Sequence, residues 1–235
     1  LHCKLYHLSD PLPLSDVIPI LENLGLRVLG EFPFHIAQDS GPSFWIHDFE
    51  FTFAANASLD IHEANDLFRE AFAAIWAGHA ENDAFNRLVL LASLPWRDVS
   101  LLRAYARYLK QIRLGFELPY IASTLIAHAD ISRELVRLFR TRFYLARKLS
   151  PADLEEMQHK LEQAILNALD NVAVLNEDRI LRRYLDLIKA TLRTNYYQPD
   201  AEGETKDYLS LKFDPSAIPE LPLPRPMFEV FVYSP

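Results

Sequence analysis

The sequence predicts an α+β fold in which an N-terminal βαββ(α) module leads into a mainly helical region and a short C-terminal β segment. Residues 1–8 and 44–53 alternate between apolar and polar side chains, as half-buried strands do. Residues 61–197 instead repeat apolar side chains at the spacing of amphipathic helices. Residues 208–213 alternate once more, so the chain returns to β structure near its C-terminal end.

Turn and cap signals separate the elements of the N-terminal module. Ser15 or Asp16 precedes a run with apolar residues at helical spacing, and Gly25 ends that helix as a left-handed cap. Residues 26–36 then form a second strand with an interruption. A hairpin-like turn at residues 40–42 leads into the third strand.

Prolines and caps divide the helical region into seven segments. Pro95 stands at the start of a predicted helix, where a backbone N–H would have no partner within the helix. Ser150 caps a helix that continues with a proline. We expect one apolar stripe along the helix after Pro95. The segments are residues 61–78, 82–92, 95–109, 119–127, 130–144, 150–171 and a last helix, capped by residues 176–178 and ending at residues 193–197.

The tail has a different composition. Residues 199–206 are polar and loop-like, and residues 218–226 contain four prolines, which predicts an extended connector. Residues 226–235 then read as the opening strand of a domain, with nothing after it to pair, and the chain has no initiator Met. We therefore expect a piece of a longer polypeptide whose exposed final strand seeks a partner.

Composition limits the class of protein. Half of the 235 residues are hydrophobic and only six are glycine, which is typical of a globular chain. A net charge of −8 argues against nucleic acid as the main partner. The single cysteine excludes an internal disulfide framework and suits the cytoplasm. No apolar run is long enough to cross a membrane, so we expect neither a nucleic-acid nor a membrane partner.

No constellation of reactive residues stands out. No glycine lies in a phosphate loop, and His62 and Glu63 lack the second histidine of a zinc helix. His47 and Asp48 adjoin on a strand and face opposite sides, so we expect one buried or hydrogen-bonded and the other exposed. Cys3 has no positive helix end nearby, which favours a buried, inert thiol. We expect no catalytic, cofactor-binding or metal-binding residue.

Two groups of basic side chains each allow two interpretations. The 133–148 cluster fits solvated cations near the negative end of a helix, or a docking surface for an acidic partner domain. It comprises Arg133, Arg137, Arg140, Arg142, Arg147 and Lys148. The second group lines the last helix and fits an interdomain contact or a ligand role. It comprises Arg179, Arg182, Arg183, Lys189 and Arg193.

Several longer strings are specific rather than generic. They are residues 11–28 (PLPLSDVIPILENLGLRV), 45–49 (WIHDF), 81–89 (ENDAFNRLV), 101–109 (LLRAYARYL), 177–183 (EDRILRR), 192–197 (LRTNYY) and 225–235 (RPMFEVFVYSP). In content and order they resemble the large-subunit bacterial NAD-specific glutamate dehydrogenases, and the resemblance covers almost the whole chain.

The resemblance implies a parent enzyme that converts L-glutamate, NAD and water to 2-oxoglutarate, ammonium and NADH. In that family the glutamate-binding segment, the catalytic lysine and the Rossmann domain lie beyond the matching region. We therefore expect no catalysis and no cofactor in this chain, with NAD bound elsewhere in the parent. The implied domains are an ACT-like α/β module at 1–78, a helical domain at 79–198, and a linker with the first strands of the catalytic domain at 199–235.

An ACT-like module suggests a place for a small effector. Such modules often bind amino acids where the first helix turns into the second strand, which here is Asn23, Leu24, Gly25 and Leu26. Gly25 would let the backbone approach a ligand closely. The alternative is that Gly25 only caps the helix.

The resulting hypothesis is a regulatory and scaffolding segment of an NAD-dependent glutamate dehydrogenase. Its partners would be the catalytic domain of the same chain, further copies of the parent in a homo-oligomer, and an amino-acid effector. One alternative is an amino-acid-sensing allosteric module. Another is a free-standing helical interaction domain, which the broken C-terminal strand disfavours.

Overall fold

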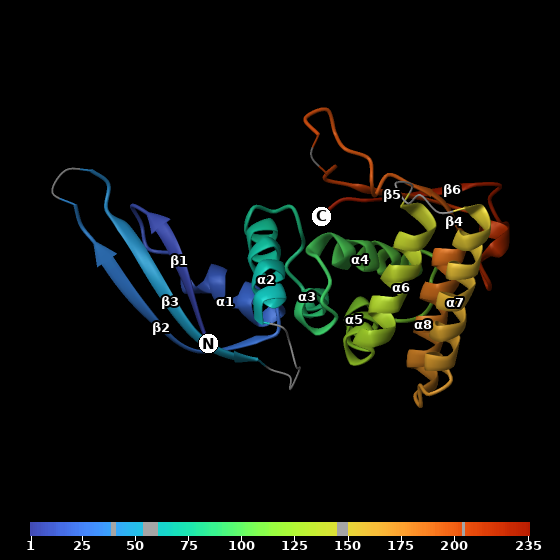
Figure 1. Cartoon of the computed structure of the whole chain (residues 1–235), viewed down its shortest axis with the longest axis horizontal. Coiled ribbons are helices and arrows are strands. Elements are labelled where there is room, and N and C mark those ends of the chain that lie inside the picture. Colours follow the sequence, from blue (N-terminus) through green and yellow to red (C-terminus); the bar gives the residue numbers. More distant parts are fainter. Residues whose placement is uncertain (39–40, 54–60, 145–149, 204) are drawn as a thin grey trace. The chain divides into compact units, whose positions relative to one another are not determined.

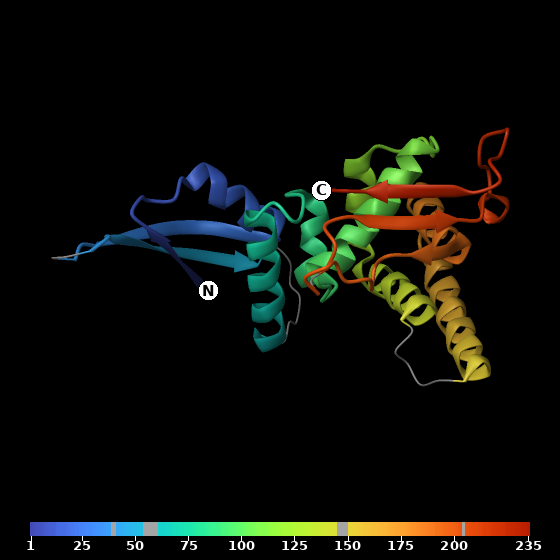
Figure 2. The same ribbon diagram turned by 90° about the horizontal axis from the view of Figure 1, so that it is seen from above.

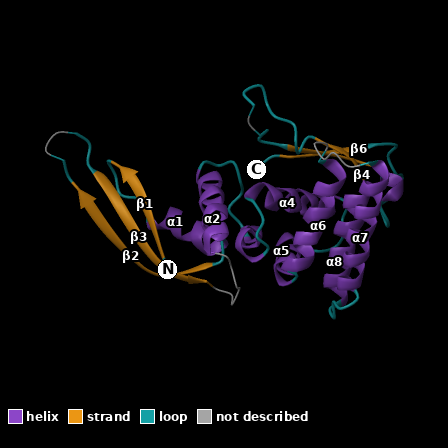
Figure 3. Ribbon diagram, in the orientation of Figure 1, coloured by secondary structure: helices purple, strands orange, loops and turns teal. Residues whose placement is uncertain are grey.

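The computed structural model of this chain describes residues 1–38, 41–53, 61–144, 150–203 and 205–235, and for residues 61–63 it describes the backbone alone. The chain forms two compact units, Leu1–Trp96 and Arg97–Pro235 (Figure 1). Strands come first, helices follow, and a short sheet ends the sequence (Figure 3). The predicted α+β class is therefore confirmed.

The first unit is built on a three-stranded antiparallel sheet. β1 (His2–Leu8), β2 (Leu26–Ile36) and β3 (Phe44–Phe53) lie in the order β1-β3-β2, so β3 pairs with both neighbours. A β-bulge follows Val28, where the sequence predicted an interruption. The turn predicted at residues 40–42 begins outside the described residues.

The helix α1 (Leu14–Asn23) starts earlier than its expected cap. Its N-cap is Pro13, with extended backbone and no side-chain cap, so Ser15 and Asp16 lie inside the first turn and the predicted cap is wrong. The proline ring already fixes a φ of −64°, which suits entry into a helix without a capping side chain. Gly25 has a φ of +89°, which confirms the left-handed C-terminal cap.

One face of the first sheet is buried. On β3 the alternate side chains His47, Phe49 and Phe51 lie on this face and are 2%, 0% and 7% exposed. α1 lies against β2, and the ring of Phe68 in α2 (Ile61–Trp76) packs on Phe51 at a centroid distance of 6.5 Å. The hydrophobic core of the unit therefore lies between this face and the two helices.

The predicted helix at residues 82–92 is shorter and tighter than expected. It consists of a 3-10 turn, η1 (Ala84–Arg87), followed by a single turn of α3 (Leu88–Leu91). Asp83 accepts a 3.0 Å hydrogen bond from the amide of Phe85, two residues later, and this local bond favours the tighter turn.

The second unit is a helical bundle with α4 at its centre. The ring of Tyr105 contacts Phe139 and Tyr184, and Tyr108 stacks on Phe213 at 4.4 Å. Helices and a sheet thus enclose α4, which buries several sides rather than the single stripe predicted. The helices are α4 (Trp96–Gln111), α5 (Leu118–Ala127), α6 (Ala129–Phe143), α7 (Pro151–Leu169) and α8 (Leu175–Ala190).

The start signals of the last two helices had different outcomes. Ser150 caps α7, and its hydroxyl oxygen accepts a 3.2 Å hydrogen bond from the amide of Asp153, as predicted. The N-cap of α8 is Val174, so residues 176–178 lie in the first turn rather than at the cap. There, acidic side chains favour the positive end of the helix dipole without capping it.

A second antiparallel sheet completes this unit. β4 (Thr191–Thr194), β5 (Leu209–Phe213) and β6 (Glu229–Tyr233) lie in the order β4-β5-β6, and the strands run side by side in Figure 2. The last helix therefore ends at Ala190, not at residues 193–197 as predicted. The final strand, expected to lack a partner, pairs with β5 of the same chain.

Candidate functional site

The predicted effector turn is well formed and its polar groups are engaged. Asn23 ends α1, and its side-chain amide donates a 3.0 Å hydrogen bond to Oδ1 of Asn82. The amides of Leu24 and Gly25 donate to carbonyls of the last turn of α1. Leu24 and Leu26 are core residues, 0% and 3% exposed. The effector role of these four residues stays a prediction.

An open depression of about 1190 Å³ lies between β1 and α2. Of the four turn residues, only Leu26 lines it. Its lining combines aromatic and aliphatic side chains with charges of both signs. These include Leu5, Phe51, Phe68 and Phe72 together with Lys4, Arg69 and Glu70.

His47 and Asp48 face opposite sides of the sheet, as predicted, but the Asp48 side chain is only 15% exposed rather than fully exposed. The buried His47 accepts a 3.0 Å hydrogen bond from the amide of Leu12 at Nε2. Its Nδ1 lies 2.8 Å from Oε1 of Glu31. Because Leu12 can only donate, Nε2 carries no proton, and Nδ1 is the donor to Glu31. His47 therefore links the chain before α1 to β2 and has a structural role.

Cys3 is half-buried on β1. Burial, followed by the nearby carboxylate of Asp48, raises the pKa of the Cys3 thiol. A raised thiol pKa lowers the fraction of nucleophilic thiolate at neutral pH. The structure thus agrees with an unreactive thiol, although the side chain is less buried than expected.

The second unit contains a buried polar cluster that the sequence did not indicate. Asp98, in the first turn of α4, has no exposed surface and accepts a 2.6 Å hydrogen bond from the hydroxyl of Tyr196. Arg140 of α6 forms an ion pair with the same carboxylate, and its Nε donates to Oδ1 at 3.1 Å. Burial raises the pKa of Asp98, and Arg140 opposes that shift.

Neighbouring contacts extend this cluster to the loop after β4. Arg97 donates to the backbone carbonyls of Lys206, at 2.9 Å, and Tyr196, at 3.3 Å. The side-chain oxygen of Asn195 accepts a 2.7 Å hydrogen bond from the amide of Ser210 in β5, and its side-chain nitrogen donates to the carbonyl of Tyr208, just before β5. These bonds hold the chain between β4 and β5 against the start of α4.

A second polar contact joins α4 to β6. The hydroxyl of Tyr108 donates a 2.6 Å hydrogen bond to Oε2 of Glu229. Burial and the neighbouring Glu229 raise the pKa of Tyr108, so the phenol stays protonated and donates. Its ring also contacts Phe231 of β6 at 5.5 Å.

The 133–148 cluster is only partly described, because Arg147 and Lys148 lie outside the described residues. Each of its other four arginines has partners within the chain. Arg133 pairs with Asp130 and Arg137 with Glu134, each three residues back on α6. Arg140 belongs to the buried cluster, and Arg142 donates to the carbonyls of Lys189 and Thr191.

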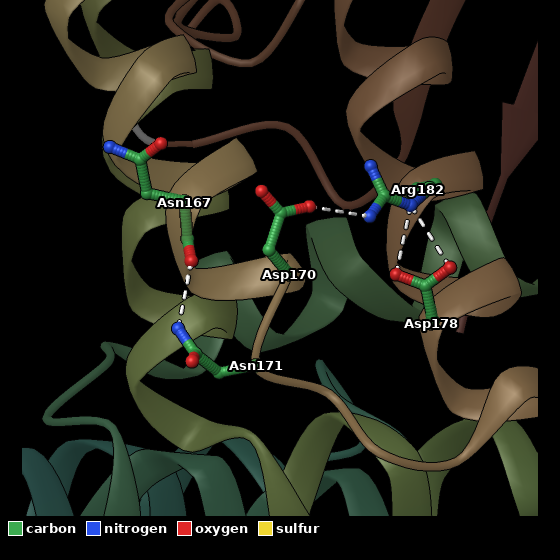
Figure 4. A network of polar contacts seen from close by, with 5 residues as sticks. All are labelled: Asn167, Asp170, Asn171, Asp178 and Arg182. Atoms are coloured by element: carbon green, nitrogen blue, oxygen red, sulfur yellow. Dashed lines mark hydrogen bonds and ion pairs between the residues drawn. The ribbon is translucent and has the colours of Figure 1, made fainter.

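Four cations of the second group lie on α8 and are also engaged within this unit, whereas Arg193 lies on β4 rather than on the last helix. Arg179 and Arg183 both reach Glu220 in the connector, and Lys189 pairs with Glu162 of α7. Arg182 binds Asp178 through Nε and Asp170 through a terminal nitrogen, which fastens the end of α7 to the start of α8 (Figure 4). These side chains therefore connect α7 to α8, and α8 to the connector.

No group of three or more histidine, cysteine, aspartate and glutamate side chains among the described residues could hold a metal ion. No helix in the described part of the chain is long and apolar enough to cross a membrane.

Sequence reasoning missed Asp98 and Tyr196 for a physical reason. Asp98 reads as an ordinary acidic residue near a helix N-terminus, and Tyr196 reads as part of a polar helix end. The available signal was an acidic residue near the start of a helix rich in apolar residues, which does not identify the partner.

The chain thus consists of a βαββα unit and, after it in the sequence, a helical bundle that anchors a small sheet. Three family models match successive parts of the chain. Residues 1–64 match "Glutamate dehydrogenase, ACT3 domain", residues 80–145 match "Glutamate dehydrogenase, helical motif 3", and residues 164–235 match "Bacterial NAD-glutamate dehydrogenase, catalytic domain".

Named relatives agree with these matches. The chain is 71% identical over its whole length to an NAD-specific glutamate dehydrogenase of Pseudomonas aeruginosa strain PAO1. Proteins of the same name from Halomonas elongata and Mycobacterium tuberculosis are 54% and 38% identical over 99% and 94% of the chain. The chain belongs to the family of bacterial NAD-specific glutamate dehydrogenases, and it spans 14% of the length of each relative.

Proposed function

We propose that this chain is a non-catalytic regulatory and scaffolding segment of an NAD-dependent glutamate dehydrogenase. The whole enzyme would oxidise L-glutamate with NAD and water to 2-oxoglutarate, ammonium and NADH, and would bind its NAD outside this chain. The matching relatives carry that enzyme's name and are about seven times longer than this chain. The single cysteine is consistent with a cytoplasmic location.

The observation that supports scaffolding most strongly is the contact of Tyr196 with Asp98. Asp98 and Arg140 belong to the range that matches helical motif 3, and Tyr196 belongs to the range that matches the catalytic domain. The buried cluster therefore fastens the first strands of the catalytic region to the helical bundle. A catalytic domain built onto these strands would depend on the bundle for its position.

The absence of catalysis in this chain has a direct test. The purified chain is incubated with L-glutamate and NAD while NADH absorbance is followed, with the full-length enzyme as the positive control. We expect no glutamate-dependent NADH from the chain. A rate that scales with chain concentration would overturn the proposal.

The scaffolding role requires the full-length enzyme. Asp98→Asn removes the charge that Arg140 pairs with, and we expect at least a several-fold loss of kcat through displacement of the catalytic region. Asp130→Asn is the matched control, because Asp130 forms an exposed ion pair on the surface of α6. Equal activity of the two variants, with Asp98→Asn still folded, would argue against scaffolding.

A second candidate is an amino-acid sensor in the first unit. The lining of the depression between β1 and α2 combines apolar side chains with charges of both signs, which suits a zwitterionic ligand. A thermal-shift screen of amino acids tests it, since a ligand at 100 times its Kd stabilises by about 2.7 kcal/mol. No shift across the panel would remove the sensor role and leave the scaffold.

A further inference from the structure

The outer face of the first sheet, opposite α1, has an exposed apolar half. In register across the three strands lie the rows Tyr6–Ile46–Phe34 and Leu8–Phe44–Ile36, and Phe32 continues them on β2. Tyr6, Leu8 and Phe34 are 67%, 60% and 53% exposed. We call these side chains the open face. Its members are Tyr6, Leu8, Phe32, Phe34, Ile36, Phe44 and Ile46.

The outer face becomes polar along the strands, first on β1 and β3. The row after Tyr6–Ile46–Phe34 carries Lys4 and Asp48 beside Phe32, and Asp48 also accepts a hydrogen bond from His2. Beyond it lie Glu50 and Arg27. A face exposed to water along its whole length would not need this boundary. The pattern therefore indicates that one half is covered and the other half is hydrated.

We propose that the open face packs against the open face of a second copy of this chain. A flat apolar sheet face is best matched by another sheet about 10 Å away. When a two-fold axis passes through the open face, the apolar half of one copy meets the apolar half of the other. The polar halves then point away from each other, so Lys4 and Asp48 of both copies stay in water.

The size of the open face is sufficient for such a contact. An aromatic side chain has about 200 Å² of surface and roughly half of it is exposed here, so the face offers on the order of 500 Å² per copy. Two copies would bury about 1,000 Å² in total, which is near the lower limit of specific interfaces. A patch of this size is comparable to the largest apolar patch of a typical monomer, and such patches are often functional. Four of its seven side chains are aromatic, a type enriched in interfaces.

Sedimentation velocity of the 235-residue chain over a range of concentrations tests the proposal. We expect a monomer–dimer equilibrium, weakened at least tenfold by Phe34→Glu and independently by Tyr6→Glu. Arg27→Glu, on the polar half of the same face, is the first control. Val232→Glu is the second, because Val232 is 58% exposed on the other sheet. Both controls should leave the dimer unchanged.

Three outcomes would overturn the proposal. They are a monomer at every concentration, a dimer insensitive to both open-face variants, or a dimer disrupted by Val232→Glu instead. Circular dichroism shows whether each variant is folded.

Should a charged variant unfold, Ile46→Cys with Cys3→Ser provides a milder test. Ile46 lies on the central strand, so a short bis-maleimide should join two copies through it. A matched Thr52→Cys variant, on the polar half, should not cross-link. If both variants cross-link equally, or if neither does, the result would argue against this contact.

Discussion

The hydroxyl of Tyr196 donates a 2.6 Å hydrogen bond to Oδ1 of Asp98, across 98 residues of sequence. Asp98 has no exposed surface, and Arg140 neutralises its charge. A buried carboxylate is tolerated only when such partners satisfy it. Burial, followed by the Asp98 charge, raises the pKa of Tyr196, so the phenol remains a donor throughout the physiological range.

Removing this hydroxyl should destabilise the second unit. Tyr196→Phe keeps the ring against Phe139 and deletes one donor to a buried charge, which costs about 1–3 kcal/mol. Urea unfolding of the isolated chain measures it. Tyr208→Phe is the control, because Tyr208 is 42% exposed, and it should change stability by less than about 0.5 kcal/mol. Equal stability of the two variants would contradict this account of the cluster.

The same unit should lose stability in alkali. Burial raises the pKa values of Tyr105, Tyr108, Tyr184 and Tyr196 in the folded chain. The folded state therefore retains phenolic protons that the unfolded state releases above about pH 10. Stability is fully present below that pH and is lost as the pH rises, by up to about 1.4 kcal/mol per pH unit for each tyrosine.

Thermal unfolding between pH 8 and 11.5, together with tyrosinate absorbance, measures this loss. We expect an abrupt rise in tyrosinate absorbance that coincides with unfolding. A gradual rise in a chain that stays folded would mean that these phenols are accessible.

Local patterns were enough to predict much of the fold. The alternation in β1, β3 and β5 and the helical spacing in α5 and α6 reflect which side chains face the core and which face water. Both patterns can therefore be recognised in the sequence alone. β4 was missed because it has only four residues and directly continues a helix. After the helix, Thr191 bonds to the hydroxyl of Tyr105 at 2.8 Å and pairs with Phe213 of β5, and local spacing predicts neither contact.

The candidate site shows the same limit. Gly25 was identified correctly as a left-handed position, because that conformation has a clear local signature. The Asp98 cluster draws its members from α4, α6 and the loop after β4. The periodicity of one segment does not predict which distant side chain pairs with a buried charge. Such contacts follow from packing, which a single sequence does not display.

Two glycines offer a matched test of the effector turn. Gly25 and Gly78 have φ values of +89° and +78°, and a Cβ would meet no atom closer than 3.7 Å at either position. Each change to alanine should therefore cost about 1–2 kcal/mol of backbone strain. If Gly25 only caps its helix, both variants keep any ligand-induced thermal shift. Selective loss of that shift in Gly25→Ala would support a ligand at the turn.

His47 provides the most specific structural prediction for the first unit. His47→Phe fills the same buried space but leaves the Leu12 amide and the Glu31 carboxylate without their shared partner. Each unsatisfied group costs about 1–3 kcal/mol, so this variant should be among the least stable of the unit. His35→Phe is the control, because His35 is exposed and its ring stacks on Trp45 as phenylalanine would. Nitrogen NMR of the unaltered chain gives independent evidence, since His47 must carry its proton on Nδ1. A proton found on Nε2, or equal stability of the two variants, would mean that His47 does not connect these segments.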